Sequence, residues 1–426
     1  MKEERMSRMI YKHTKGDRLK GLLLAVFLLL AAWPASGATV TLDECLALAM
    51  EYHPALEEAR AALDAERSRL RAVEAATAFS GGISASTSKQ TGADQSWSAS
   101  FTVTKLLSDS GKNALERKSR RLAIDSSVES QREAMLSVRR GVKDAYHYLA
   151  LQQLKLEQAV TAVGTYERHL ERARGFYEAG AKAKFDVTKA EVDLSSARIA
   201  LLSAKGDLAR AGASLSNSVG AELGDVEVLT DFPSPLDLPE ETFALEQALE
   251  NRPDVRIARM RQESGELSVS LAAKGDAATI SLSGSASLSG RDWPLDDSFR
   301  ASVALSAPLF DGGLTDARVE ESRHALRGAE AAVERAVQSA VHDVRTSLLS
   351  AREAEARIPA AELQMRQAEE NLALAEGRYE TGVGSALEVA DALLAFERAK
   401  AGVHQARHDY AAALVALEKS LGGEFQ

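Results

Sequence analysis

The sequence predicts a mainly α-helical fold whose short β-strands contribute to a membrane β-barrel. Three observations support this prediction. A unit made of a helix, a β-hairpin and a long helical hairpin occurs twice; its strands alternate apolar residues with Ser and Thr; and its helices repeat apolar residues every three or four positions. Aromatic residues make up only 5% of the chain, which is typical of long packed helices rather than of a compact enzyme core.

The first stretch of the chain predicts export. Basic residues up to Lys20 precede an apolar run over 21–32 and small residues over 34–38, an order typical of a signal peptide, which we place at residues 1–37. The run is shorter than the roughly twenty residues that a membrane-spanning helix needs, and no later segment is apolar enough. Without this segment's seven basic and three acidic residues, the formal net charge changes from −10 to −14. Such an acidic chain argues against nucleic acid as a partner.

Internal repetition predicts the domain organisation. The segment FYEAG, which ends at Gly180, recurs as RYETG, which ends at Gly382, so the two copies are offset by 202 residues. A proline-rich stretch between the copies reads as a linker that passes outside the helices. We therefore predict a first repeat over 38–225, a linker over 226–241, a second repeat over 242–423 and a short tail over 424–426.

The strands of each repeat have one apolar and one hydroxyl-bearing face. Each is about ten residues long, which is the length that a tilted strand needs to span a membrane. For any single strand, a soluble sheet with one wet face is an equal alternative. Four strands with few charges among their Ser and Thr residues favour a wall between lipid and a water-filled lumen. We place the strands at about 79–89, 96–106, 279–289 and 299–309, with Phe101, Val103, Leu282, Val303 and Leu305 facing lipid.

The number of strands predicts an oligomer. The smallest membrane barrels have about eight strands, so the four strands of one chain cannot close. An open sheet edge does not occur in lipid, because its backbone groups would have no hydrogen-bonding partner. Several chains must therefore share one barrel.

A helical hairpin ends each repeat. Large and small apolar residues alternate without a break from Val187 to Leu215, and the same seam recurs from Val389 to Leu417. This pattern is typical of knobs-into-holes packing between closely spaced helices. The tips of the hairpins are predicted near Gly180 and Gly382.

Helix lengths predict how the two hairpins combine. The long helix from about 113 to 178 would extend roughly 100 Å if straight. The helix predicted over 42–76 is about half as long, so it can stack end to end on the returning helix of the hairpin. Pro359 interrupts the second long helix, where we expect a kink or a break.

Residues that support enzyme chemistry are few. Cys45 lies among apolar residues and, as a lone cysteine, is expected to be a core residue. His404 and His408 can share a helix face, but no third ligand accompanies them at a typical spacing, so we predict neither a metal nor another cofactor. The Asp311-Gly312-Gly313 sequence lacks the remaining pattern of a phosphate loop and is better explained as a turn. No enzyme activity is predicted.

Several motifs resemble the TolC family of outer-membrane efflux proteins. The most specific is Pro308-Leu309-Phe310-Asp311-Gly312-Gly313, which is similar to the family's junction between the last strand and the following helix. The equivalent place in the first repeat has Asp109-Ser110-Gly111-Lys112. The resemblance implies a homotrimer with a twelve-stranded barrel in the outer membrane and a large periplasmic α-barrel. It also implies a periplasmic adaptor protein and an inner-membrane pump (RND, ABC or similar) as partners, with export of small molecules or polypeptides.

The same resemblance assigns roles at the second hairpin tip. Glu388 and Asp391 match acidic positions at the periplasmic constriction, where three copies would form acidic rings that favour cations. The alternative is that both are ordinary acids at a helix N-terminus, where the helix dipole favours them. Tyr379 matches a position that helps hold the tips closed. The basic partner that the family has five residues later is Gly384 here, so this chain lacks one partner of the family's locking contact.

Two pairs of tip residues match the turns that the family's adaptors contact. These are Gly180 with Ala181 and Gly382 with Val383, for which simple turn glycines are the alternative explanation. The other function considered is a periplasmic adaptor or coiled-coil scaffold protein. Such a protein would also have a helical hairpin, but it would not need two pairs of strands with an apolar and a hydroxyl face.

Overall fold

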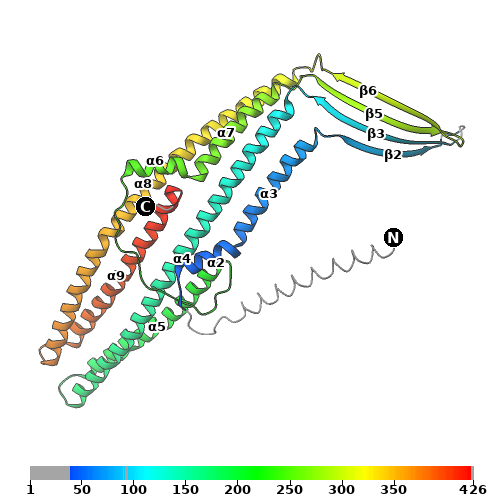
Figure 1. The fold of residues 1–426 in the computed structure, drawn as a ribbon. Helices are drawn as coiled ribbons and strands as arrows, with labels where there is room; N and C mark the ends of the chain where they lie inside the picture. Colours follow the sequence, from blue (N-terminus) through cyan, green and yellow to red (C-terminus); the bar gives the residue numbers. More distant parts are fainter. Residues whose placement is uncertain (1–38, 90, 92–94, 424–426) are drawn as a thin grey trace, which may run out of the picture.

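The protein is an elongated helical bundle with a four-stranded sheet at one end (Figure 1). This computed structural model describes residues 39–89, 91 and 95–423, and the predicted signal peptide and C-terminal tail lie outside these ranges. Within them, no helix combines the length and the apolar character needed to cross a membrane.

The two repeats contain the same elements in the same order. Their long helices both have 67 residues and their returning helices both have 36, which confirms the predicted mainly helical fold with short strands for a single chain. The first repeat comprises β1 (Thr39–Val40), α2 (Leu42–Tyr52), α3 (Pro54–Ala75), β2 (Ser80–Ser88), β3 (Ser96–Ser108), α4 (Lys112–Glu178) and α5 (Lys184–Val219). The linker contains β4 (Glu227–Val228), and the second repeat comprises α6 (Glu241–Asn251), α7 (Pro253–Ala272), β5 (Thr279–Gly290), β6 (Asp296–Ser306), α8 (Leu314–Glu380) and α9 (Ala386–Leu421).

The predicted single helix over 42–76 is wrong, because the chain breaks at His53. This residue is extended (φ −68°, ψ 124°) and its imidazole Nδ1 accepts a hydrogen bond from the backbone N–H of Ala55 at 3.2 Å. Pro54 begins α3, since proline has no N–H to donate and disfavours helical backbone in the residue before it. Arg252 and Pro253 produce the same break between α6 and α7.

Of the kink or break expected at Pro359, the break does not occur. α8 continues through this residue although proline removes one hydrogen bond of the helix. The neighbouring Ile358 packs on a buried cluster that includes Ala354 and Tyr410, so tertiary contacts hold this stretch helical.

Half-length helices complete full-length columns beside α4 and α8. α3 and α5 both pack against α4, while α7 and α9 both pack against α8. The short helices α2 and α6 contact α5 and α9, respectively, at the junctions between the half-length helices. Because α4 also contacts α7 and α9, the helices lie side by side in an order whose outer members are α3 and α5 on one side and α8 on the other.

The linker is attached to the middle of this row of helices. Its strand β4 pairs in parallel with β1, and the Tyr146 hydroxyl accepts a hydrogen bond from the backbone N–H of Leu229 at 3.1 Å while donating to the carbonyl of Val40 at 3.2 Å. The Tyr410 hydroxyl accepts a hydrogen bond from the Leu236 N–H at 2.9 Å. Cys45 is fully buried in the core nearby, where burial raises the pKa of its thiol to about 11.

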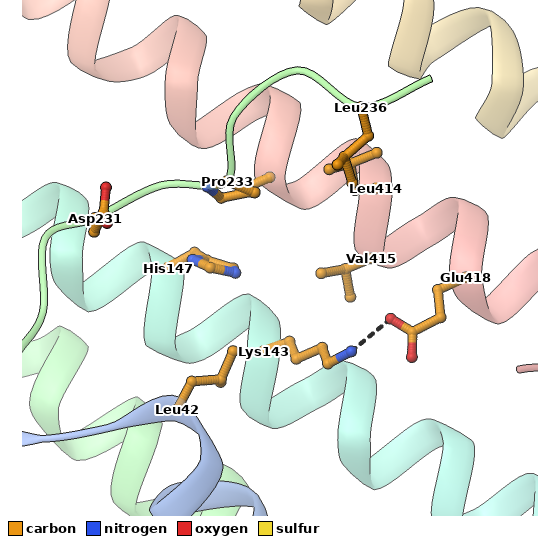
Figure 2. Close-up of a pocket in the computed structure, with 10 residues that line it drawn as sticks. Leu42, Lys143, His147, Asp231, Pro233, Leu236, Leu414, Val415 and Glu418 are labelled. Atoms are coloured by element: carbon orange, nitrogen blue, oxygen red, sulfur yellow. Dashed lines mark hydrogen bonds and ion pairs between the residues drawn. The ribbon is translucent and has the colours of Figure 1, made fainter. Parts of the chain in front are cut away.

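A cavity of about 410 Å³ lies beneath the linker, between α4 and α9 (Figure 2). The Lys143 ammonium and the Glu418 carboxylate form an ion pair of 2.6 Å along its wall. His147 packs on Phe232 of the linker, with 6.0 Å between the ring centroids, and burial lowers the pKa of its imidazole to about 4. The imidazole is therefore neutral near pH 7 and serves as a packing group under the linker.

The four longer strands form one antiparallel sheet in the order β2-β3-β5-β6, so the hairpins of the two repeats join through β3 and β5. β6 covers 296–306 rather than the predicted 299–309. Asp296 and Asp297 pair in register with Ser289 and Leu288 of β5, and this cross-strand pairing extends the strand into charged residues that resemble a loop in sequence.

Candidate functional site: the sheet and the hairpin tips

The sheet has two chemically different faces. In a β-strand successive side chains point to opposite faces, and residues paired across strands share a face. The predicted lipid-facing residues fall on one face by this register: Val103 aligns with Gly284 and Ala301, Leu282 aligns with Val303, Leu305 aligns with Ile280, and Phe101 aligns with Ile83 and Ala286.

The opposite face is lined with hydroxyl groups that bond to each other across the strands. The Oγ atoms of Ser84 and Ser100 lie 2.8 Å apart, and those of Ser283 and Ser302 are at the same distance. Three further serine pairs repeat this contact, namely Ser86 with Ser98, Ser88 with Ser96, and Ser287 with Ser298.

Two edges of the sheet have no neighbour in the described part of the chain. β2 and β6 are the outer strands, and every residue of both is exposed. Their unpaired backbone groups are ready to pair with another strand.

The second hairpin tip is a tight turn built around two glycines. Gly382 has a φ of +80°, which a glycine adopts without strain, and its N–H donates to the Tyr379 carbonyl at 3.1 Å. The N–H of Gly384 donates to the Arg378 carbonyl at 2.8 Å. A Cβ at Gly384 would lie 2.9 Å from the backbone N of Tyr379 and 3.0 Å from the carbonyl C of Arg378. This turn therefore excludes the basic residue expected at position 384, because no side chain fits there without a backbone shift.

A basic residue of the first tip lies beside this turn instead. The Lys182 ammonium donates to the Gly384 carbonyl at 3.0 Å and lies 4.9 Å from the centre of the Tyr379 ring. Lys182 and Gly384 are 202 residues apart, which is the repeat offset, so the two tips have a lysine and a glycine at equivalent positions. Sequence reasoning missed Lys182, although superposing the repeats would have identified it.

Tyr379 joins the two tips. Its side chain is 2% exposed and contacts Phe176 edge to face, with the ring centroids 5.5 Å apart, and His169 at 5.9 Å. The pKa of the Tyr379 phenol is raised, mainly by burial and to a smaller extent by the nearby Asp186 carboxylate. The hydroxyl is buried and makes no hydrogen bond, so packing and the Lys182 cation hold this side chain.

Ion pairs add to the contact between the tips. The Arg172 guanidinium lies 3.3 Å from the Glu380 carboxylate and 3.8 Å from the Glu376 carboxylate, and all three side chains are at least one third exposed. Exposed pairs of this kind typically contribute about 0–1 kcal/mol each. The buried aromatic contact is therefore the stronger link.

The two predicted constriction acids have different surroundings. Glu388 lies in the first turn of α9, where Ser385 caps its N–H at 3.2 Å, and its carboxylate is 3.4 Å from the Arg378 guanidinium. Asp391 is exposed one turn later and has no ion-pair partner among the described residues. Glu388 thus has the local role of a helix N-terminal acid, whereas Asp391 presents a carboxylate without a counter-charge.

The predicted adaptor-contact residues all lie at the exposed end of the hairpins. Gly180 has a φ of +70° and its N–H donates to the Tyr177 carbonyl at 2.9 Å, which closes the first turn. Ala181 and Gly382 are exposed, and Val383 is 73% exposed. An exposed valine at a tip is available for contact with another protein.

The two histidines considered as metal ligands lie on the buried side of α9. Burial lowers the pKa of His404, and the His408 ring contacts Tyr148 with the centroids 6.2 Å apart. Across the described ranges, no cluster of three or more His, Cys, Asp or Glu side chains is arranged to hold a metal ion.

Comparison with protein families assigns the chain. A family model described as outer membrane efflux protein matches residues 45–221 and 244–423, which are the two repeats without most of the linker. The chain belongs to the outer membrane efflux protein family. The family assignment agrees with the predicted resemblance and with an outer-membrane location.

Curated relatives of this efflux family member share about a quarter of the aligned residues or fewer. Outer membrane protein TolC of Vibrio cholerae is 23% identical over 294 residues, which cover 66% of this chain and 66% of the relative. Outer membrane protein TolC of Escherichia coli K12 is 22% identical, over 60% of this chain and 55% of the relative. The matched region thus spans between about half and two thirds of these relatives.

Solved structures of outer-membrane channels have the same fold. The outer membrane protein VceC of Vibrio cholerae matches with a TM-score of 0.78 at 21% identity, covering 90% of this efflux family member and 97% of VceC. CusC matches with a TM-score of 0.82 at 18% identity, covering 92% and 96%, respectively. The MtrE channel of Neisseria gonorrhoeae, solved in its open state, matches with a TM-score of 0.77 at 21% identity, covering 90% and 89%.

Proposed function

We propose that three copies of this chain form an outer-membrane duct of a tripartite efflux or type I secretion system, which exports small molecules or polypeptides. The observation that carries the proposal is the sheet with one apolar face, one hydroxyl face and two unpaired edges. Unpaired backbone groups are not tolerated in lipid, so β6 of one copy pairs with β2 of the next. Three copies supply twelve strands, an even number within the range of membrane barrels.

Exposed apolar residues on the outer helices support the same assembly. α5 presents Val192, Ile199 and Leu202, which are 56%, 65% and 70% exposed, on one side of the row of helices. α8, on the other side, presents Leu349, Leu363 and Leu374, which are 64%, 48% and 63% exposed. In a ring of three copies these two stripes face each other, and burying them favours closure of a helical tunnel below the barrel.

The hairpin tips form the periplasmic end of this duct, where its protein partners would bind. The exposed turns at Gly180–Ala181 and Gly382–Val383 would contact a periplasmic adaptor, which connects the duct to an inner-membrane pump. Asp391, and to a smaller extent Glu388, would line the periplasmic entrance as acidic rings that favour cations. In this arrangement the chain is a passive path and catalyses no reaction.

Fractionation and conductance test the proposal together. The full chain should be recovered in the outer-membrane fraction, resist extraction by detergents that solubilise the inner membrane, and conduct ions after insertion into planar lipid bilayers. Recovery in the soluble periplasm without any channel activity would reject the duct and favour the periplasmic adaptor or scaffold.

A further inference from the structure

The hydroxyl face of the sheet has one basic residue near the middle of the strands. Arg300 is the fifth of the eleven residues of β6 and is exposed. It aligns with Ser285 of β5, which in turn aligns with Thr102 of β3, so its side chain belongs to the hydroxyl face. Among the residues of the four strands, no other basic side chain lies on this face.

No carboxylate neighbours Arg300 on this face. Ser298 and Ser302 lie on either side of it along β6, and Ser283 and Ser287 are its diagonal neighbours on β5. The nearest acid of the face on β6 is Asp296, four residues away, which corresponds to about 13 Å along a strand. β2, the strand that would come from a neighbouring copy, contains no ionisable residue between Ser80 and Ser88. The guanidinium therefore has no counter-charge from either adjacent strand.

On the apolar face, the charged residues lie toward the ends of the strands rather than at their middle. Lys105 lies toward the helical end of β3 and its ammonium is 4.4 Å from the centre of the Phe79 ring, while Asp297 is the second residue of β6. A long side chain near the membrane surface can extend so that its charge lies in the interface. An arginine at mid-strand on a lipid-facing surface cannot reach the interface, and its burial in lipid would destabilise the barrel. The mid-strand position of Arg300 is therefore compatible with a wet lumen and not with lipid.

We propose that Arg300 from three copies forms a ring in the barrel lumen that attracts anions, and that it opposes the cation preference of the acidic periplasmic entrance. The inference rests on the proposed duct. Rings of basic side chains favour anions in pores, and a guanidinium binds oxyanions such as phosphate groups with two parallel hydrogen bonds. The ring thus selects multivalent oxyanions, or cargo that carries them, at the outer end of the path.

Ion selectivity tests this assignment in a background that lacks the acidic entrance. The channel with Glu388→Ala and Asp391→Ala is compared with the same channel carrying Arg300→Gln, in planar bilayers under a KCl gradient. Near 0.1 M salt, Arg300→Gln should raise the ratio of cation to anion permeability roughly twofold or more, and the difference should shrink near 1 M, where the screening length falls from about 10 Å to about 3 Å.

Two matched variants make the result specific. Arg300→Lys keeps the charge and should keep the permeability ratio of the background channel. Lys105→Gln removes the same charge from the opposite face of the same sheet and should leave the ratio unchanged. An unchanged ratio in Arg300→Gln, or an equal change in Lys105→Gln, would overturn the proposal.

A second measurement needs no substitution at Arg300. Inorganic tripolyphosphate added on the barrel side of the background channel should reduce the current near 0.1 M salt and have little effect near 1 M. A current that tripolyphosphate leaves unchanged at both salt concentrations contradicts the ring. A background protein that forms no channel refutes the duct itself, whereas a conducting channel with unaltered selectivity refutes only the role of Arg300.

Discussion

The sheet and the hairpin tips, at opposite ends of the molecule, depend on different partners. At the tips, Tyr379 is buried by aromatic and basic residues of the same chain. In the sheet, Phe299 is 81% exposed and Ile83 is 82% exposed, and the outer strands have no neighbour in the described chain. One chain thus forms the contact between its two tips by itself, whereas the outer strands of its sheet have no partner within the described chain.

The largest expected effect concerns the sheet. Val303→Arg places a charge on the apolar face and should destabilise the inserted assembly by about 2–4 kcal/mol at the membrane midplane, and by less toward its ends. Ser302→Arg is the matched control, because it places the same charge on the hydroxyl face one residue away. The yield of assembled protein in outer-membrane fractions measures both. Greater damage from Ser302→Arg would reverse the facing of the sheet and break the comparison.

The second effect concerns the close packing of the tip. Gly384→Ala should destabilise the tip by about 1–3 kcal/mol, because the added methyl group would meet the backbone of residues 378 and 379. Hydrogen exchange of the tip amides measures this effect. Gly402→Ala in α9 is the control: nothing lies within 4 Å of its added methyl group, and replacing a helical glycine should stabilise by up to about 1 kcal/mol. If both substitutions gave the same exchange rates, the steric explanation of Gly384 would be wrong.

The third effect concerns the link between the two tips. Lys182→Gln removes the cation from the Tyr379 ring and weakens the bond to the Gly384 carbonyl, at a cost of about 1 kcal/mol. The tips should separate more often, and open periods in single-channel records should become more frequent. Lys184→Gln, two residues further along, is the control for loss of charge. A similar change in both variants would mean that net charge matters rather than the contact with Tyr379.

The smallest expected effect on stability comes from replacing the two acids at the second tip, Glu388 and Asp391. Their replacement should instead change the ion selectivity of the channel. Asp391→Ala should lower cation preference more than Glu388→Ala, because Arg378 already lies beside the Glu388 carboxylate. Reversal potentials under a salt gradient compare the two variants. Equal selectivity of both variants and the native channel would remove the acidic rings from the account.

Local patterns predicted most of the fold. The alternation in the strands and the three-and-four spacing in the helices are properties of neighbouring residues, so these elements could be recognised from the sequence alone. Two departures came from distant contacts: α8 is not broken at Pro359 because the cluster around Tyr410 supports it, and β6 begins at Asp296 because β5 offers a partner there. The break at His53 has a local cause, since Pro54 follows it and is visible in the sequence.

The candidate site was predictable only where it follows the repeat. Glycines at the two tips and acids after the second tip are visible in the sequence. Lys182 and Gly384 are equivalent positions of the two repeats, but their equivalence does not show that the two tips touch, which depends on how the repeats pack together. Likewise, Glu388 and Arg378 form an ion pair only because the turn between them folds back, and the residue types alone do not predict that geometry.

The particle mass in detergent is the most direct test of the central claim that the barrel closes only between copies. Light scattering of the purified protein, corrected for bound detergent, should give three times the chain mass. A stable particle with the mass of one chain would contradict the account, since its two open strand edges would then remain without partners.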